Sequence, residues 1–253
     1  MRCCCDYPVL QIPKKIRDLP MTSDQENPAE KSKVYATAGS ALGDISNGAS
    51  VMIAGFAGSG VPEFLLRGLA ATGVSELTLI CQGTWLPRQG TFGIADVVAN
   101  GQVKKMIAPM PFHPESGGAV KELWQAGKLE LEVVPQGILA ERIRAGGAGI
   151  GGVFLLTGSK TRFAEGKELR QFDGKEHALE FALKADVALL RANEADTLGN
   201  LSYDGTGRNW NPTMAMAATM TVAEVDRVVD SGGINPELVI TQAIFIDRLV
   251  LAK

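Results

Sequence analysis

Residues 47–66 read NGASVMIAGFAGSGVPEFLL, and this stretch decides the fold of the chain. The apolar run at residues 51–54 has the length and the turn-residue borders of a buried strand. A glycine-rich segment, residues 55–60, follows at once, and Pro62 and Glu63 have the composition of a helix start. The stretch therefore predicts a strand, a glycine loop and a helix. Since glycines let a backbone approach a ligand closely and helix starts present free N–H groups, we predict a ligand-facing loop here.

Strand-like and helix-like segments continue to alternate after this stretch. We expect strands at residues 77–81, 103–107, 129–134 and 152–156, and helices at residues 34–47, 94–99, 120–126 and 137–145. Such alternation is typical of a parallel sheet covered by helices, and ligands of these sheets bind outside the carboxyl ends of the strands. That rule places four segments on one rim: residues 55–60, 82–88, 109–116 and 136–137.

The second half has a different pattern. Asp173-Gly174 is a strong turn signal between residues 169–172 and 176–181, so we predict a hairpin there. Further strands are expected at residues 187–191, 200–203, 238–241 and 244–251, with a small-residue helix at 212–220. The predicted fold class is α/β: an open, mostly parallel sheet flanked by helices, with an added antiparallel hairpin region.

Composition limits the domain organisation and the class of partner. Of 253 residues, 45% are hydrophobic and 21% charged, which is ordinary for a globular protein, and residues 33–253 are predicted to form one domain. We expect residues 1–32 to be disordered, or to extend upstream of a natural start near Met21. The net charge of −3 argues against nucleic acid, and no apolar run approaches the roughly 20 residues of a membrane helix.

The cysteines do not indicate a metal site or a disulfide framework. Cys3, Cys4 and Cys5 are consecutive and Cys81 stands alone, so the spaced pairs of a zinc site are missing. We therefore expect no metal and a cytoplasmic location.

Several motifs allow a functional and a structural interpretation. Residues 147–152 match the GxGxxG spacing, but a helix precedes them and a strand follows, so we interpret them as a tight turn rather than a nicotinamide site. Ser59 lacks the GxSxG spacing of a hydrolase and is interpreted as a hydrogen-bonding group at the helix start. Glu141, beside Arg142 and Arg144, is interpreted as an ion-pair residue.

Gln136 leaves two interpretations open. It lies on the predicted rim and could donate a hydrogen bond to a carbonyl or thioester oxygen, or it could be a helix-capping or surface residue. The rim contains glycines and backbone donors but no credible nucleophile, metal cluster or isolated carboxylate. We infer that the reactive group of such a site comes from elsewhere.

Several blocks in order resemble the alpha subunit of family I CoA-transferases, the 3-oxoacid type, from about Val34 to Leu251. The first block is NGxxVMIAGFxxxGxP at residues 47–62. The others are VPQG at 134–137 with LAERIRAGGAG at 139–149, EGKE at 165–168, FDGK at 172–175, DxxGNL at 196–201 and RNxNP at 208–212.

The resemblance implies an enzyme that exchanges CoA between an acyl-CoA donor, such as succinyl-CoA or acetyl-CoA, and a short 3-oxo or related acid. The nucleophilic glutamate would belong to a beta subunit, in a Ser-Glu-Asn-Gly motif that this sequence lacks, and would form a glutamyl-CoA thioester. The CoA thioester would be a substrate rather than a permanent cofactor, and the assembly a heterodimer or heterotetramer. Gln136 would lie near the thioester. The expected CoA-contacting residues are Ala54, Gly55, Phe56, Ala57, Gly58, Ser59 and Gly60.

The chain also departs from the family pattern. Ala54 stands where the family usually has glycine, and residues 82–89 and 108–114 are bulkier and richer in proline, so Trp85, Arg88 and Phe112 could shape an unusual acid pocket. Two other functions stay open at this point. One is a non-catalytic module of the same fold that senses CoA or a phosphorylated metabolite, and the other is a nicotinamide-dependent oxidoreductase.

Overall fold

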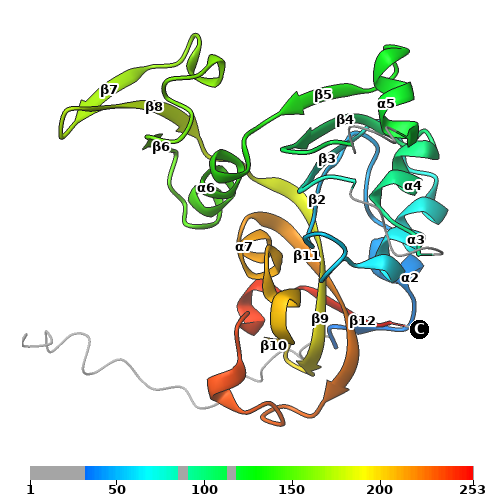
Figure 1. The fold of residues 1–253 in the computed structure, drawn as a ribbon. Coiled ribbons are helices and arrows are strands. Elements are labelled where there is room, and N and C mark those ends of the chain that lie inside the picture. Colours follow the sequence, from blue (N-terminus) through cyan, green and yellow to red (C-terminus); the bar gives the residue numbers. More distant parts are fainter. Residues whose placement is uncertain (1–31, 85–90, 113–117, 253) are drawn as a thin grey trace, which may run out of the picture. The chain divides into compact units, whose positions relative to one another are not determined.

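The computed structural model describes residues 32–84, 91–112 and 118–252, which belong to one compact unit (Figure 1). The predictions for residues 1–31, with Cys3, Cys4 and Cys5, lie outside the described residues, as do those for Trp85 and Arg88. Within the described ranges, no helix combines the length and the apolar character needed to cross a membrane.

The main sheet contains nine strands within the described residues, and all its pairings are parallel except that of β10 with β9. Their order is β1-β12-β11-β9-β2-β3-β4-β5, with β10 at the side of β9. The bounds are β1 (Val34–Tyr35), β2 (Ser50–Ile53), β3 (Leu77–Cys81), β4 (Val103–Ala108), β5 (Glu130–Val133), β9 (Ala185–Asp196), β10 (Leu201–Ser202), β11 (Ala218–Val229) and β12 (Arg248–Leu251).

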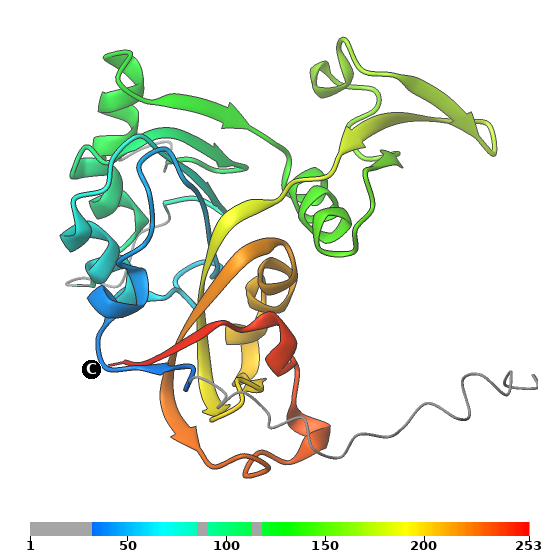
Figure 2. The ribbon, with the colours of Figure 1, turned by 180° about the vertical axis from the view of Figure 1, so that it is seen from behind.

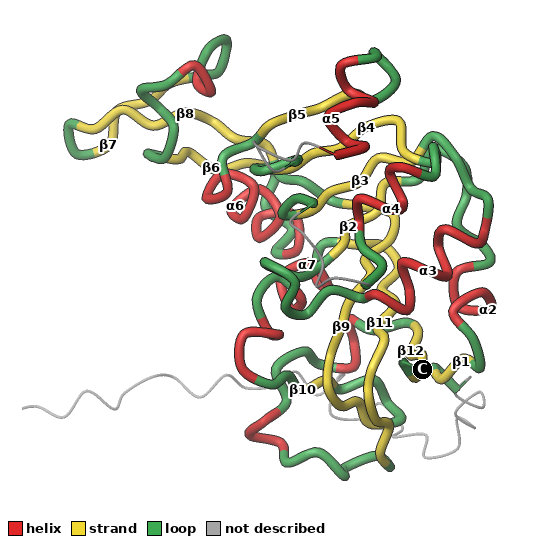
Figure 3. The backbone as a smooth tube through the Cα atoms, turned by 45° about the vertical axis from the view of Figure 1, so that its right-hand side comes forward, coloured by secondary structure: helices red, strands yellow, loops and turns green. Residues whose placement is uncertain are grey.

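Helices cover both faces of this sheet, and Figure 3 shows them as two layers. One layer holds α2 (Ala38–Leu42), α3 (Glu63–Thr72), α4 (Ile94–Ala99) and α5 (Gly118–Gln125); the other holds α6 (Gln136–Gly147) and α7 (Asn211–Met216). Successive side chains of a strand point to opposite faces. Accordingly Val51 and Ile53 pack in the first layer's core, while Met52 packs in the second. The predicted parallel sheet with flanking helices is confirmed.

A smaller antiparallel sheet holds β6 (Gly152–Leu155), β8 (Lys175–Phe181) and β7 (Leu169–Phe172), in that order. Figures 1 and 2 both show it extending away from the main sheet. The hairpin of β7 and β8 turns at Asp173 and Gly174, as predicted. The prediction of a buried strand at residues 152–156 is wrong in its environment, because β6 is half-buried and pairs only in this outer sheet.

Other sequence predictions also need correction. Residues 34–47 do not form one helix: β1 comes first, and α2 begins after Thr37, whose side chain accepts a hydrogen bond from the Ser40 amide at 3.1 Å. The helix predicted at 212–220 ends at Met216, and β11 then runs through the middle of the sheet.

The last predicted strands are shorter than expected. Residues 238–241 form only an isolated bridge after the 3-10 helix η3 (Pro236–Leu238), and the predicted strand at 244–251 is reduced to β12 after η4 (Ala243–Phe245). The N-terminal half of the sheet therefore followed its sequence pattern more closely than the C-terminal half.

Candidate functional site

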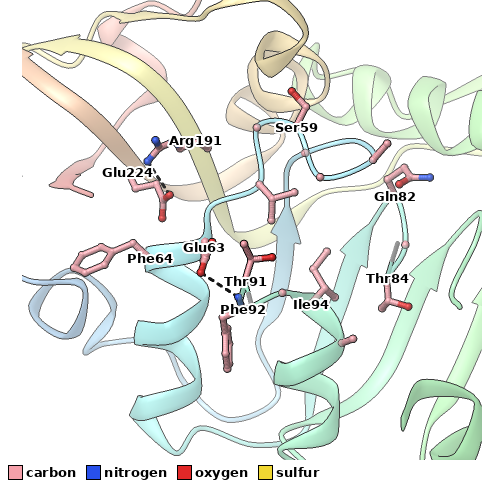
Figure 4. A pocket seen from close by; sticks show the side chains of 18 of the residues that line it. Ser59, Glu63, Phe64, Gln82, Thr84, Thr91, Phe92, Ile94, Arg191 and Glu224 are labelled. Carbon is pink, nitrogen blue, oxygen red and sulfur yellow. Dashed lines mark hydrogen bonds and ion pairs between the residues drawn. The ribbon is translucent and has the colours of Figure 1, made fainter. Parts of the chain in front are cut away.

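A cavity of about 780 Å³ lies at the carboxyl ends of the central strands (Figure 4). It is lined by the loop after β2, the start of α3, residues 82–84 after β3 and residues 91–95 at the start of α4. Arg191 of β9, Thr206, Glu224 of β11 and Ala252 form the rest of the lining. Because these strands are parallel, their carboxyl ends meet at one edge, which is where ligands of such sheets bind.

The glycine loop makes a tight two-residue turn. Phe56 and Ser59 exchange two backbone hydrogen bonds of 2.9 Å, and the residues between them, Ala57 and Gly58, have φ values of 48° and 81°. Positive φ at both central residues is the mark of a type I′ turn. Gly55 has φ of 109°, and a Cβ there would lie 2.4 Å from Val61 Cγ2, so only glycine fits.

The tip of the loop has unused donors. Among the described residues, the amide N–H groups of Ala57, Gly58 and Gly60 donate to no other protein group. All three residues line the cavity. Consecutive N–H groups in a turn of this kind can bind an anion or a carbonyl oxygen.

Side chains from a distant part of the sequence hold the loop in place. Asn211 donates to the carbonyls of Gly60 at 3.2 Å and Gly207 at 2.8 Å, and accepts the Arg191 amide at 2.8 Å. Asn209 donates to the Ser59 carbonyl at 3.0 Å. These two asparagines belong to the RNxNP block at residues 208–212, and the structure gives that block a physical role that the sequence did not reveal.

The predicted role of Ser59 at the helix start is wrong. The residue before α3 is Pro62, which makes no side-chain cap, and the Ser59 hydroxyl lies 3.0 Å from the hydroxyl of Thr206 in the 3-10 helix η2 (Gly205–Arg208). Ser59 therefore ties the loop to η2 instead of capping α3.

Two carboxylates occupy the start of α3. Glu224 accepts the Leu65 amide at 2.8 Å, and Glu63 accepts the Phe92 amide at 3.0 Å and the Arg67 guanidinium at 2.7 Å. Negative groups are stabilising at this end of a helix. The expectation of free N–H groups at the helix start is thus corrected: the donors left for a ligand are those of the loop.

The two carboxyl groups have opposite pKa shifts. Burial raises the pKa of Glu224 to about 7, although the Leu65 amide and Arg191, 3.0 Å away, act in the other direction. For Glu63, burial also acts to raise the pKa, but the Phe92 amide and Arg67 outweigh it and hold the pKa below its ordinary value. The paired Arg191 also contacts Asp226.

The other predicted site residues lie apart from this cavity or outside its lining. Gln136 is exposed at the start of α6, beyond the end of β5, and Ala54 is buried in the sheet. Phe56 is 38% exposed at the loop but does not line the cavity. Phe112 packs against Trp124, with ring centroids 5.9 Å apart. The structure thus brings together Gly55 and residues 57–60 of the predicted set.

The structural interpretations of Glu141 and of the GxGxxG match at residues 147–152 are confirmed. Glu141 pairs with Arg144 at 2.8 Å, whereas Arg142 reaches Glu132 at 3.1 Å. Of residues 147–152, Gly147 ends α6, Gly152 begins β6, and residues 148–151 form the turn between them.

Comparisons with known proteins agree with this architecture. The family model described as Coenzyme A transferase matches residues 35–252. The A subunit of 3-oxoadipate CoA-transferase from Pseudomonas putida is 45% identical over 218 residues, which cover 86% of this chain and 93% of that protein. The A subunit of succinyl-CoA:3-ketoacid coenzyme A transferase from Xanthomonas campestris pv. campestris (strain B100) is 44% identical over 220 residues, covering 87% and 88%.

A solved structure shares the fold. It is an acyl-CoA transferase of Escherichia coli O157:H7 in a thioester complex with CoA, and it matches with a TM-score of 0.75 at 21% identity. The match covers 87% of this chain and 47% of that polypeptide, so this chain spans about half the length of that structural relative.

Proposed function

This chain belongs to the coenzyme A transferase family, and we propose that it is the alpha subunit of an enzyme that transfers CoA between carboxylic acids. The donor would be an acyl-CoA of the succinyl or acetyl type, and the acceptor a short 3-oxo or related acid. Residues 33–253 would form the alpha-subunit domain, and a beta subunit would complete the enzyme as a heterodimer or heterotetramer.

One observation carries the division of labour between the subunits: the cavity has free backbone donors but no competent nucleophile among its described residues. The Ser59 hydroxyl is paired with a threonine rather than with a base. Glu224 is held by the Leu65 amide and Arg191. Cys81, at the end of β3, is buried, and burial raises the pKa of its thiol to about 12, which disfavours the reactive thiolate.

The proposed chemistry follows from this gap. In the beta subunit, a glutamate carboxylate attacks the acyl-CoA carbonyl, which gives a mixed anhydride and releases the CoA thiolate. The thiolate then attacks the glutamyl carbonyl of the anhydride, which forms the glutamyl-CoA thioester and releases the donor acid. The acceptor acid repeats these steps in reverse order and leaves as its CoA thioester.

This chain would bind and polarise the reactants. Each attack places negative charge on a carbonyl oxygen, and preorganised donors stabilise that charge. We assign the donor role to the loop amides of residues 57, 58 and 60, and we keep Gln136 as a second candidate donor near the thioester. Both are uncharged, so they would stabilise an oxyanion without changing the charge of the attacking glutamate.

The test compares three samples: this chain, its beta subunit, and the mixture of both. Only the mixture is expected to transfer CoA from a fixed acyl-CoA donor to an added acid, measured by separating the thioester products by chromatography. Treatment of the mixture with borohydride should reduce a glutamyl thioester on the beta subunit, which would inactivate the enzyme. CoA binding by this chain without any exchange in the mixture would instead favour the ligand-sensing function.

A further inference from the structure

Gln82 differs from every other buried polar side chain in the part of the chain that the structure describes. It follows β3 directly and is 4% exposed, yet its side-chain amide has no hydrogen-bond partner among the described residues. The other buried polar residues all have partners. Gln102, for example, is 5% exposed and donates to the carbonyls of Leu69 at 3.2 Å and Val74 at 2.9 Å. An unpaired buried amide is costly to keep unless something outside the folded chain pairs with it.

The amide of Gln82 is open to the cavity. Among the described residues, every side-chain nitrogen or oxygen that is sealed from solvent has a hydrogen-bond partner. Because the Gln82 amide has no such partner, it must be open to solvent-accessible space. Gln82 is part of the lining of the cavity, and Figure 4 shows it on the side opposite Arg191 and Glu224. A ligand in the cavity can therefore reach the amide that no described protein group has taken.

The backbone around Gln82 is fixed, which presets the position of its side chain. Gly83 forms a bridge with Met110 after β4, and a Cβ at Gly83 would lie only 1.9 Å from the Met110 carbonyl oxygen. Thr84 donates its hydroxyl to the Pro111 carbonyl at 2.6 Å. The ends of β3 and β4 are thus held together, and binding through Gln82 would require little ordering of the backbone.

The charges in the cavity indicate what kind of group Gln82 would bind. Among the described lining residues the charged side chains form two pairs, Arg67 with Glu63 at 2.7 Å and Arg191 with Glu224 at 3.0 Å. Since both arginines are already paired, neither is free to bind the second carboxylate of a dicarboxylic acid substrate. A neutral amide is instead suited to donate to an uncharged carbonyl oxygen.

We propose that Gln82 is a specificity-determining residue that donates a hydrogen bond to the 3-oxo group of the acid. The inference rests on the proposed function, and it assigns to this chain the recognition of the acid's carbonyl oxygen. A site built to pair with a substrate oxygen discriminates strongly against an analogue that lacks it, because the buried amide is then left unpaired.

Three acceptor acids of similar size show whether Gln82 recognises a 3-oxo group, a second carboxylate or neither. Acetoacetate has the 3-oxo group, succinate has the second carboxylate, and butyrate has neither. Each acid is tested as the acceptor for the complete enzyme with one fixed acyl-CoA donor. In Gln82→Leu, kcat/KM for acetoacetate should fall by at least about tenfold while that for butyrate changes less than about threefold. The near-isosteric Gln82→Glu, which loses both amide donors when ionised, should also lose the preference for acetoacetate.

Gln102→Leu is the matched control, because it removes a buried amide whose donors are already used. It should lower the Tm and leave the acetoacetate-to-butyrate ratio unchanged, whereas Gln82→Leu should keep the Tm or raise it. If Gln82→Leu lowers kcat/KM for all three acids alike, changes none of them, or acts on succinate alone, the assignment is overturned. Failure of the wild-type enzyme with every acid would refute the proposed function itself, so the two failures are distinguishable.

Discussion

The Asn211→Ala substitution tests whether one buried amide holds the glycine loop. Asn211 is fully buried, and its amide joins three backbone groups, the carbonyls of Gly60 and Gly207 and the amide of Arg191. A hydrogen bond contributes about 1 kcal/mol net, and each buried partner left unpaired costs about 1–3 kcal/mol. The loss of three such bonds should therefore reduce the free energy of unfolding by about 3–5 kcal/mol.

Urea unfolding of the purified chain, followed by tryptophan fluorescence, measures this loss. A protein of this size has an m-value of about 2–3 kcal/mol/M, so the midpoint should fall by roughly 1–2.5 M at unchanged m. Asn209 also joins three backbone groups, the carbonyls of Ser59 and Thr206 and the amide of Trp210, but it is only half-buried, so water can replace the lost bonds. The matched control is therefore Asn209→Ala. It should cost about 1 kcal/mol. A midpoint shift below roughly 0.3 M for Asn211→Ala, or equal shifts for the two variants, would refute the reasoning.

Three further substitutions test other parts of the structure. Gly55→Ala would place its Cβ 2.9 Å from the Val61 Cα, so it should lower both the Tm and CoA exchange, and normal exchange would contradict a role for the loop. Glu224 has a pKa raised to about 7 from 4.5, so its contribution to stability is present below about pH 4.5 and lost as pH rises to about 7. In the wild type this loss of unfolding free energy is on the order of 3 kcal/mol between about pH 5 and pH 8, and it appears as a fall in the urea midpoint. Glu224→Gln should remove the fall. If the midpoint of the variant still falls with pH as in the wild type, another group is titrating. Lys167→Met leaves Glu180, which is 4% exposed, without its ion-pair partner, and it should lower the Tm, whereas Lys104→Met in an exposed pair should not.

The sequence predicted those parts of the fold whose signals are local. The apolar run before Gly55 and the Asp173-Gly174 turn each lie within a few residues of the elements that they define, and both predictions are confirmed. Local patterns failed for β11 for two reasons. Its buried middle, residues 221–225, includes the charged Glu224, and its first residues continue the pattern of small residues and methionines that begins in α7. The carboxyl group of Glu224 is accommodated in this buried strand because the Leu65 amide and Arg191, from β9, both pair with it.

The site was predictable only in part, for a similar reason. The glycine loop has its own composition signal, but its supports come from about 150 residues later in the chain: Asn211 binds Gly60, and Glu224 binds the Leu65 amide. No spacing rule connects positions so far apart. The position of Gln82 on the rim was predicted, but its lack of a hydrogen-bond partner was not, because an unpaired amide is recognised only when all of its neighbours in space are known.

The contacts at the start of α3 also determine which backbone N–H groups of this chain are available to bind an anionic ligand. A helix start attracts anions through its free N–H groups and its dipole, and this was the basis of the sequence prediction. Here the Glu224 carboxyl group has taken the Leu65 amide, and the Glu63 carboxylate lies at the same helix start, so a phosphate or carboxylate bound there would have to displace Glu224 and lie next to the negative charge of Glu63. The amides of Ala57, Gly58 and Gly60 face no such competition from the described residues. Under the proposed function, CoA or a developing oxyanion would therefore contact the turn, and α3 would support that turn rather than form a second anion site.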